Sequence, residues 1–278
     1  MKTHKTKAPA HTQKLLDLYK NNPFNYNLDI KVVACKNPSS EVTICCHGYG
    51  GNSAFVNIVD KYNSFSGNLI GFNFFDHDIN EHTDHTKSAY GTPQEIMPLL
   101  YLLKRCVCDL QLKLINLYGC SAGGGAIINA LSALAGTDYD ILLKELNIFK
   151  KDKQAILLAL KNGVIILDCP LKSVQEIISF RGSDKNLKIL ESHYIKNNME
   201  PLGTLRTMQK IDLTIFLNFE MPDTVLSNRD DQLFINEIMK INQGRTIIST
   251  SSDQGHIGYH SKLWENYKAF KTEQTLLC

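Results

Sequence analysis

The run LINLYGCSAGGG, residues 114–125, joins two patterns of different period. Leu114–Tyr118 is a short apolar run typical of a buried strand, and the small and apolar residues from Ala126 onward are typical of a helix. Gly119-Cys120-Ser121-Ala122-Gly123 lies between them with the spacing G-x-S-x-G. In that spacing a strand meets a helix through a turn so sharp that only small residues fit around the serine, whose hydroxyl stays exposed. The run therefore predicts a strand–turn–helix unit with Ser121 as a nucleophile.

A glycine-rich turn of this kind also occurs where a helix only packs closely on a strand, or where a phosphate is bound. Phosphate binding is the weaker interpretation, because the chain lacks the pattern G-x-x-x-x-G-K-[ST] and this turn contains no lysine. Close packing without chemistry stays open on this segment alone.

A second glycine-rich turn, His47-Gly48-Tyr49-Gly50-Gly51, follows the apolar run Val42–Cys46. After a central strand, such a turn lets backbone N–H groups face the space above a neighbouring serine, where an acyl-transfer enzyme must stabilise a tetrahedral oxyanion. We expect the N–H groups of Tyr49 and Ala122 to be the two donors of this oxyanion hole. A dinucleotide fingerprint would need glycine or alanine at position 53, which is Ser53, so that interpretation is excluded.

A histidine follows the last predicted strand, Thr246–Ser249, in the loop Asp253-Gln254-Gly255-His256. An imidazole titrates near neutral pH, so it suits a group that takes a proton from a serine and returns it to the leaving group. Of the nine histidines, His256 is the one in a glycine-flanked loop C-terminal to both the nucleophile and the candidate acids. We therefore predict His256 as the general base, with His260 as the alternative.

The order of these motifs resembles that of the α/β-hydrolase family: a His-Gly-x-Gly-Gly turn, a later G-x-S-x-G turn, then an acid and a histidine. The resemblance spans about Leu28 to Phe270, nearly the whole chain. It implies a doubly wound, mostly parallel sheet and a Ser–acid–His triad that requires no cofactor. It does not imply a particular substrate.

Three carboxylates are candidates for the acid. The family commonly places this residue just after a late strand, here the predicted strand Leu213–Leu217, and before a hydrophobic β-branched residue. This favours Asp223, which precedes Thr224-Val225. Glu220 at the same strand end is an alternative acid. Asp168 is another, because it follows the strand Val164–Leu167, whose end some members of the family use. The acid holds the imidazole in one tautomer and stabilises the imidazolium, so one of the three fills this role.

Seven short apolar runs are predicted to be strands: Leu28–Ala34, Val42–Cys46, Leu69–Phe75, Leu114–Tyr118, Val164–Leu167, Leu213–Leu217 and Thr246–Ser249. Several are nearly continuous Val, Ile, Leu and Phe, as in strands covered on both faces, and helix-period segments separate them. This pattern predicts the α/β class with a largely parallel sheet. One of the helices is expected to start at Thr92-Pro93-Gln94-Glu95, which has the pattern of a capping box.

A single domain over residues 1–278 is expected, because no Pro-, Gly- or Ser-rich stretch divides the chain and no internal repeat is present. Helical insertions at about residues 136–162 and 171–210 are longer than one packing helix requires. In the family such excursions form a cap over the serine. The alternative is that they extend the outer helical layer.

Composition limits the partners and the compartment. The chain has 30 Lys and Arg against 28 Asp and Glu and no dense basic stripe, so nucleic acid is not an expected partner. No apolar run approaches the roughly 20 residues that cross a bilayer. The basic segment Met1–Lys14 lacks the following apolar stretch of a secretory signal. We expect a cytoplasmic protein with reduced cysteines and no transmembrane segment, with a dedicated export route as the alternative.

Two clusters contain residue types that bind metals. The loop 76–85 holds three histidines and four carboxylates, and Cys106-Val107-Cys108 is a C-x-C. Neither shows the converging set of ligands that a metal site needs. We therefore expect no metal or cofactor, and we expect the loop to be solvated or to line the entrance to the site.

These features together predict a serine hydrolase, similar to a carboxylesterase or lipase, that acts through an acyl-enzyme. Its substrate would be a small-molecule or lipid-like ester, thioester or amide. The alternative is a non-catalytic binding or interaction protein with the same fold, because a fold alone does not determine function.

Overall fold

The computed structural model describes residues 28–34, 41–62, 65, 67–74, 90–136, 139–181, 185–252, 255–256 and 262–276. The segment Met1–Lys14, the histidine-rich loop 76–85 and the alternative base His260 lie outside the described residues. The expectations for these three segments stay predictions.

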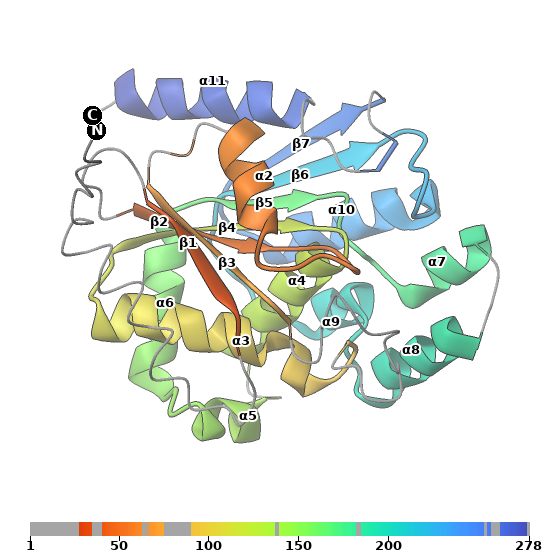
Figure 1. Cartoon of the computed structure of the whole chain (residues 1–278), viewed down its shortest axis with the longest axis horizontal. Coiled ribbons are helices and arrows are strands. Elements are labelled where there is room, and N and C mark those ends of the chain that lie inside the picture. Colours follow the sequence, from red (N-terminus) through yellow and green to blue (C-terminus); the bar gives the residue numbers. More distant parts are fainter. Residues whose placement is uncertain are drawn as a thin grey trace, which may run out of the picture.

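Within the described ranges, seven strands form one sheet in the order β1-β3-β2-β4-β5-β6-β7 (Figure 1). They are β1 (Ile30–Val33), β2 (Glu41–Cys46), β3 (Asn68–Phe72), β4 (Leu114–Cys120), β5 (Ile165–Asp168), β6 (Ile215–Glu220) and β7 (Thr246–Ser251). β1 pairs antiparallel with β3, and the other neighbouring pairs are parallel. The predicted strands and the largely parallel sheet are confirmed.

Helices cover both faces of this sheet, as the doubly wound arrangement requires. They are α2 (Phe55–Tyr62), α3 (Pro93–Lys104), α4 (Ala122–Ala135), α5 (Asp140–Glu145), α6 (Lys150–Lys161), α7 (Val174–Arg181), α8 (Lys185–Lys196), α9 (Pro201–Thr207), α10 (Asp231–Ile241) and α11 (Lys262–Leu276). A π-helical turn, η2 (Arg105–Asp109), continues α3, and a 3-10 turn, η3 (Asn228–Asp230), precedes α10. Figure 1 shows α2 and α11 on one face and α3, α4 and α6 on the other. Among the described helices, none combines the length and apolarity needed to span a membrane.

The two faces of the sheet bury separate hydrophobic clusters. Successive side chains of a strand point to opposite faces, so Leu117 of β4 packs in one cluster and Tyr118 in the other. The face under α2 and α11 is rich in aromatic rings, with Tyr118 stacked on Phe55 and edge-on to Trp264. The opposite cluster is mainly aliphatic. Because both faces are covered, the carboxyl ends of the strands are where this sheet presents polar side chains to a ligand.

The capping box predicted at the start of α3 is wrong. The helix begins at Pro93, but Thr92 makes no side-chain cap. The Glu95 carboxylate instead accepts hydrogen bonds from the Gly91 N–H at 2.9 Å and from the Tyr194 hydroxyl at 3.1 Å. Tyr194 belongs to α8, so Glu95 combines a local contact one residue before the expected cap with a tertiary contact from a distant segment.

Both predicted insertions are helical. The first holds α5 and α6, and α6 packs on β4, α4 and η2. The second holds α7, α8 and α9; α7 packs on α8, and α9 packs on α4 and α10. Figure 1 shows α7 and α8 on the side toward which the arrows of β6 and β7 point. A cap role for either insertion stays a prediction.

Candidate active site

Ser121 joins β4 to α4 in a strained backbone conformation, with φ 50° and ψ −122°. A non-glycine residue held in a sparsely populated region costs about 1–3 kcal/mol and persists only where its surroundings fix it. Here the Ser121 N–H donates to the Asp168 carbonyl at 3.1 Å. The Ser121 carbonyl accepts hydrogen bonds from the N–H groups of Leu171 at 2.8 Å and Gly124 at 3.0 Å. The predicted strand–turn–helix unit is therefore present, and neighbouring backbone holds its strained residue.

The small residues around Ser121 are required by close backbone contacts. A Cβ at Gly123 would lie 2.2 Å from the Cys46 carbonyl oxygen, so α4 approaches the end of β2 more closely than a side chain permits. A Cβ at Gly48 would lie 3.2 Å from the Cβ of Ser121. The glycine-rich turn after β2 thus lies directly against the serine.

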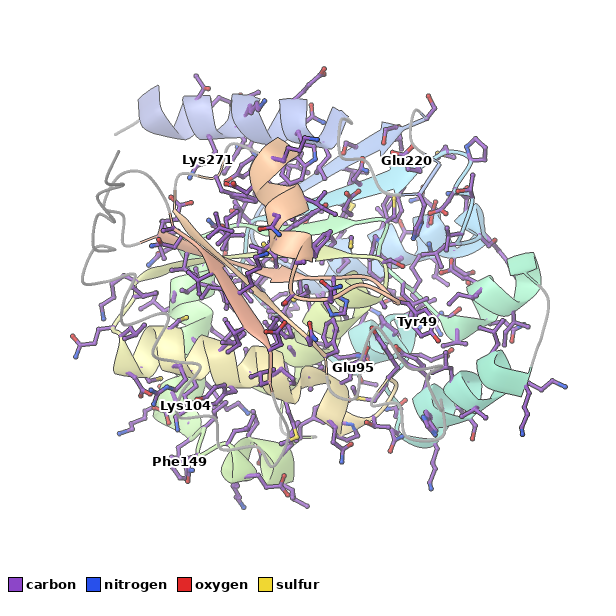
Figure 2. The ribbon with its side chains drawn as sticks, in the orientation of Figure 1. Tyr49, Glu95, Lys104, Phe149, Glu220 and Lys271 are labelled. Atoms are coloured by element: carbon purple, nitrogen blue, oxygen red, sulfur yellow. The ribbon has the colours of Figure 1, made fainter. Side chains whose placement is uncertain are left out.

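This arrangement places both expected oxyanion donors in segments that adjoin Ser121. Ala122 is the first residue of α4, where a backbone N–H has no intrahelical carbonyl to bond. Tyr49 lies in a turn closed by a hydrogen bond from the Gly51 N–H to the Gly48 carbonyl at 3.0 Å. Its side chain is 49% exposed, and Figure 2 shows it on the same side of the molecule as Glu220 of β6.

His47 is buried and supports the turn. Its Nε2 accepts a hydrogen bond from the Phe74 N–H at 3.4 Å, and its Nδ1 lies 2.7 Å from the Gly48 carbonyl oxygen. With Nε2 as an acceptor, the proton is on Nδ1, which donates to that oxygen. The first histidine of the motif therefore has a structural role, because its ring connects the turn after β2 to the chain just after β3.

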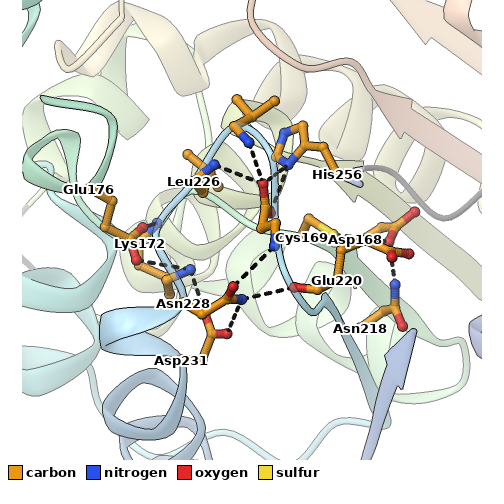
Figure 3. Close-up of polar contacts among 12 residues, drawn as sticks. Asp168, Cys169, Lys172, Glu176, Asn218, Glu220, Leu226, Asn228, Asp231 and His256 are labelled. Carbon is orange, nitrogen blue, oxygen red and sulfur yellow. Dashed lines mark hydrogen bonds and ion pairs between the residues drawn. The ribbon is translucent and has the colours of Figure 1, made fainter. Parts of the chain in front are cut away.

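Asp223 and His256 are directly paired. Figure 3 shows the His256 ring with its polar contact drawn as dashed lines. Nδ1 of His256 lies 2.9 Å from Oδ1 and 2.8 Å from Oδ2 of Asp223. Oδ1 also accepts hydrogen bonds from the N–H groups of Val225 at 2.7 Å and Leu226 at 2.8 Å. Nδ1 therefore donates, which leaves Nε2 of His256 as the acceptor nitrogen of the ring.

Backbone geometry around the pair fixes the histidine loop. Gly255 has φ +79°, a region that suits glycine, and its carbonyl accepts a hydrogen bond from the Thr224 N–H. This bond joins the loop after β6 that carries Asp223, called here the acid loop, to the loop after β7 that carries His256, called the histidine loop. It lies next to the side-chain contact between Asp223 and His256. The chain thus uses main-chain and side-chain hydrogen bonds together to hold the imidazole.

The two alternative acids have other partners. Glu220 bonds to the Ser251 hydroxyl within the sheet. Asp168 accepts hydrogen bonds from Asn218 Nδ2 at 2.8 Å and from the Tyr118 hydroxyl at 3.0 Å. Burial raises the pKa of Asp168 to about 6, although both of these hydrogen bonds act in the opposite direction. Among the described residues, Asp223 is the one that hydrogen-bonds to the His256 ring.

A short loop after β5 connects the serine to this pair, and sequence reasoning missed its role. Cys169 has φ 46°, and its Sγ lies within 4.8 Å of both the Asp223 carboxylate and the His256 ring. The same loop bonds to Ser121 through Asp168 and Leu171. No motif marks Cys169, whose one sequence signal is its position at a strand end.

Ser121 and His256 are not hydrogen-bonded to each other in this structure. Nε2 of His256 is buried and has no hydrogen-bond partner among the described residues. Catalytic hydrogen bonds are often long in unliganded sites and shorten when substrate binds. The arrangement thus holds an oriented imidazole with a free acceptor nitrogen at the same edge of the sheet as the strained Ser121.

Cys169, Asp223 and His256 are also of types that bind metal ions. Two of their donor atoms are already engaged, because His256 Nδ1 donates to Asp223 and Asp223 Oδ1 also accepts two backbone N–H groups. Burial, with the neighbouring carboxylates Asp168 and Asp223, raises the pKa of the Cys169 thiol, so the thiolate that a metal needs is disfavoured. The contacts fit a hydrogen-bonded acid–histidine pair better than a set of metal ligands.

No family model and no curated protein matches the sequence. Solved structures resemble the chain over most of its length. A lipase/esterase from Lactobacillus plantarum is 12% identical, with 92% of this chain and 96% of that chain covered and a TM-score of 0.61. Esterase 2 from Thermogutta terrifontis, phosphoramylated by tabun, is 12% identical, with 90% of each chain covered and a TM-score of 0.59. Alpha/beta hydrolase domain-containing protein 10 from mouse is 12% identical, with 90% of this chain and 94% of that chain covered and a TM-score of 0.52.

Proposed function

Since the chain has the α/β-hydrolase fold, we propose that it is a serine hydrolase that cleaves a carboxylic ester through an acyl-enzyme. Ser121 is the nucleophile, His256 the general base and Asp223 the acid. The observation that carries the proposal is the hydrogen bond of 2.8 Å between His256 Nδ1 and Asp223. This pair lies at the edge of the sheet where backbone hydrogen bonds hold Ser121. Esterases among the structural neighbours, one of them phosphoramylated, support the same reaction class.

In the first half of the reaction, the Ser121 hydroxyl attacks the ester carbonyl while His256 Nε2 takes its proton. Asp223 stabilises the imidazolium that forms and keeps Nδ1 protonated. The N–H groups of Ala122 and Tyr49 donate hydrogen bonds to the carbonyl oxygen as it becomes negative. When the intermediate collapses, the imidazolium gives its proton to the leaving alkoxide, and the acyl group stays on Ser121.

In the second half, a water molecule takes the place of the alcohol. His256 Nε2 removes a proton from this water as the water oxygen attacks the acyl-enzyme carbonyl. Collapse of the second tetrahedral intermediate returns the proton from His256 to Ser121 Oγ and releases the carboxylic acid. The residues complete the cycle without an external cofactor.

The substrate is proposed to be a small-molecule or lipid-like ester. Tyr49 and Met221 are exposed apolar side chains, 49% and 51% accessible, on the oxyanion turn and the acid loop. Helices α7 to α9, inserted between β5 and β6, are proposed to cap this side of the sheet. Together they would form an apolar surface for the acyl or alcohol part of the ester.

Ester hydrolysis by wild type and Ser121→Ala tests the proposal. We expect wild type to hydrolyse p-nitrophenyl esters of short or medium acyl chains and Ser121→Ala to stay at background. A fluorophosphonate probe is expected to add to Ser121 of the folded wild-type protein. Equal rates in both proteins would remove Ser121 from the mechanism, and the absence of an adduct would favour the non-catalytic binding protein.

A further inference from the structure

The side chain of Asn228 joins the two ends of the loop that carries Asp223. Its Oδ1 accepts a hydrogen bond from the Asp223 N–H at 3.0 Å, and its Nδ2 donates to the Glu220 carbonyl at 2.8 Å. The amide therefore joins the end of β6 to the residue that holds the histidine (Figure 3). We call this set of bonds the Asn228 clip.

Asp231 fixes the orientation of the Asn228 amide. Its Oδ2 accepts a hydrogen bond from Asn228 Nδ2 at 2.7 Å. A carboxylate accepts hydrogen bonds and does not donate them, so the NH₂ end of Asn228 must face Asp231. The amide oxygen is then directed to the Asp223 N–H.

Asp231 is in turn held by a buried cation. Lys172 Nζ lies 2.7 Å from Asp231 Oδ1 and 2.9 Å from Glu176 Oε1, and the lysine side chain is 2% exposed. It also lies over the ring of Phe219 in β6, 5.7 Å from the centroid. Lys172 lies two residues before α7, and its carbonyl accepts a hydrogen bond from the Leu202 N–H of α9 at 3.0 Å. The buried ion pair therefore connects the second insertion to the acid loop.

We propose that Asn228, oriented by Asp231 and Lys172, is a positioning residue that holds Asp223 where it fixes the tautomer and direction of the His256 ring. The inference rests on the proposed function, because the ring matters only if it shuttles a proton. Asn228 makes its contacts to the acid loop and not to the reacting atoms. Its loss should therefore reduce the rate of the chemical step rather than the binding of substrate.

The chain offers a matched control at the other end of the same strand. Asn242 Oδ1 accepts a hydrogen bond from the Leu213 N–H, and its Nδ2 donates to the Leu213 carbonyl, each at 3.0 Å. It also accepts from the Gly244 N–H at 3.2 Å and donates to Thr246 Oγ1 at 3.0 Å. Asn228 and Asn242 are thus two side-chain clips at the two ends of β6, and Asn228 alone of the two bonds to the acid loop.

The test compares Asn228→Asp with Asn242→Asp. Each change keeps the side-chain shape and removes the NH₂ donor, and Asn228→Asp also faces Asp231 with a second carboxylate. We expect kcat for a p-nitrophenyl ester to fall about 10- to 100-fold in Asn228→Asp, in line with a misplacement of about 1 Å. KM should stay within about twofold of wild type. In Asn242→Asp we expect a lower thermal midpoint and a kcat within about twofold of wild type.

A second variant and a second measurement keep the outcomes separate. Asn228→Ala removes the clip without adding a charge, and we expect the same fall in kcat with unchanged KM. In a Ser121→Ala background, the far-downfield NMR signal of the proton on His256 Nδ1 should be present and should weaken when Asn228→Ala is added, but not when Asn242→Ala is added.

Three results are decisive. A wild-type kcat in folded Asn228→Asp and Asn228→Ala would overturn the inference. Equal losses in the Asn228 and Asn242 variants would show a merely structural role and would also overturn it. An inactive wild type would instead overturn the proposed function, whereas the NMR comparison would still support or refute the positioning of His256 by Asn228.

Discussion

The two ends of the parallel strands use the same kinds of side chain for opposite purposes. At the amino ends, Asn242 and Asn116 satisfy backbone and side-chain groups of neighbouring strands; Asn116 Oδ1, for example, accepts from the Val164 N–H at 2.9 Å. At the carboxyl ends, Ser121 and Cys169 both have positive φ. The amino edge thus joins neighbouring strands through side-chain amides, one of which also donates to the Glu41 carboxylate at 2.6 Å, and the carboxyl edge carries the strained residues of the two turns.

Buried carboxylates gather at the carboxyl ends, although Glu41 is buried at the amino end of β2. Asp168, Glu220 and Asp223 are all buried within the last residues of β5 and β6 or the loop that follows. Asp168 has its pKa raised to about 6 because burial disfavours its ionised form. Features of this kind cost stability and are typical of functional sites, where the surrounding structure compensates for them. The contrast supports the proposal that the carboxyl edge holds the active site, while the amino edge joins the strands.

Replacing the acid should produce the largest effect and tests the contrast within one strand end. We expect Asp223→Asn to lower kcat about 10³- to 10⁴-fold, because the amide stabilises the wrong imidazole tautomer and cannot stabilise the imidazolium. Glu220→Gln, at the same strand end, should stay within about tenfold of wild type. Steady-state kinetics with a p-nitrophenyl ester measures both. A greater loss in Glu220→Gln than in Asp223→Asn would assign the acid to Glu220.

A buried carboxylate near the oxyanion turn provides the next test. Glu95 is fully buried, and burial raises its pKa to about 8 despite hydrogen bonds from Gly91 and Tyr194. Tyr90, next to Gly91, packs against the ring of Tyr49 at 5.4 Å. Since the folded pKa is raised above the usual 4.5, the folded state binds this proton more tightly than the unfolded state. Its contribution to stability is complete below about pH 4.5 and is lost as the pH rises to about 8.

Glu95→Gln should remove this pH dependence. We expect the variant to gain stability relative to wild type as the pH rises from 5 to 8, by about 2–4 kcal/mol at the upper end. Chemical denaturation at a series of pH values measures the difference. Asp168→Asn is the matched comparison. Because the pKa of Asp168 is raised only to about 6, we expect the stability difference between this variant and wild type to change mainly below that pH. A Glu95→Gln difference that stays flat from pH 5 to 8 would refute the assigned ionisation.

Most of the architecture could be predicted from the sequence because it follows from local patterns. Strands such as Ile165–Asp168 are marked by runs of apolar residues, and the turn at Ser121 by the small residues that its geometry demands. The preference for Asp223 over Glu220 came from the order of motifs in a family, and the contact of Asp223 with His256 agrees with it. Features that short segments determine are therefore visible in the chain itself.

The parts that could not be predicted depend on contacts between distant segments. Glu95 was expected to form a capping box with Thr92, but its carboxylate accepts hydrogen bonds from the Gly91 N–H and from Tyr194, 99 positions away. Cys169 carries no motif, and its place near Asp223 arises where β5 and β6 lie side by side. Asn228 is only five positions from Asp223, but its amide bonds to Asp231, which pairs with Lys172 from a distant segment. Such networks are set by tertiary packing, which one sequence without its fold does not reveal.

The smallest expected effect comes from a glycine-to-alanine change at each edge of the sheet. Using the same substitution at the carboxyl and the amino edge compares the two edges most directly. A Cβ at Gly48 would lie 3.2 Å from the Cβ of Ser121, whereas a Cβ at Gly163, just before β5, would lie 2.1 Å from the Ile115 carbonyl oxygen. The first contact can be relieved by a shift of a few tenths of an ångström at the serine, and the second requires backbone to move. We therefore expect Gly48→Ala to lower kcat/KM about tenfold with little change in Tm. Gly163→Ala should lower Tm and leave kcat/KM near the wild-type value at a temperature where it is folded. If both variants lose activity only in proportion to their loss of stability, the carboxyl edge has no special sensitivity and the contrast between the two edges fails.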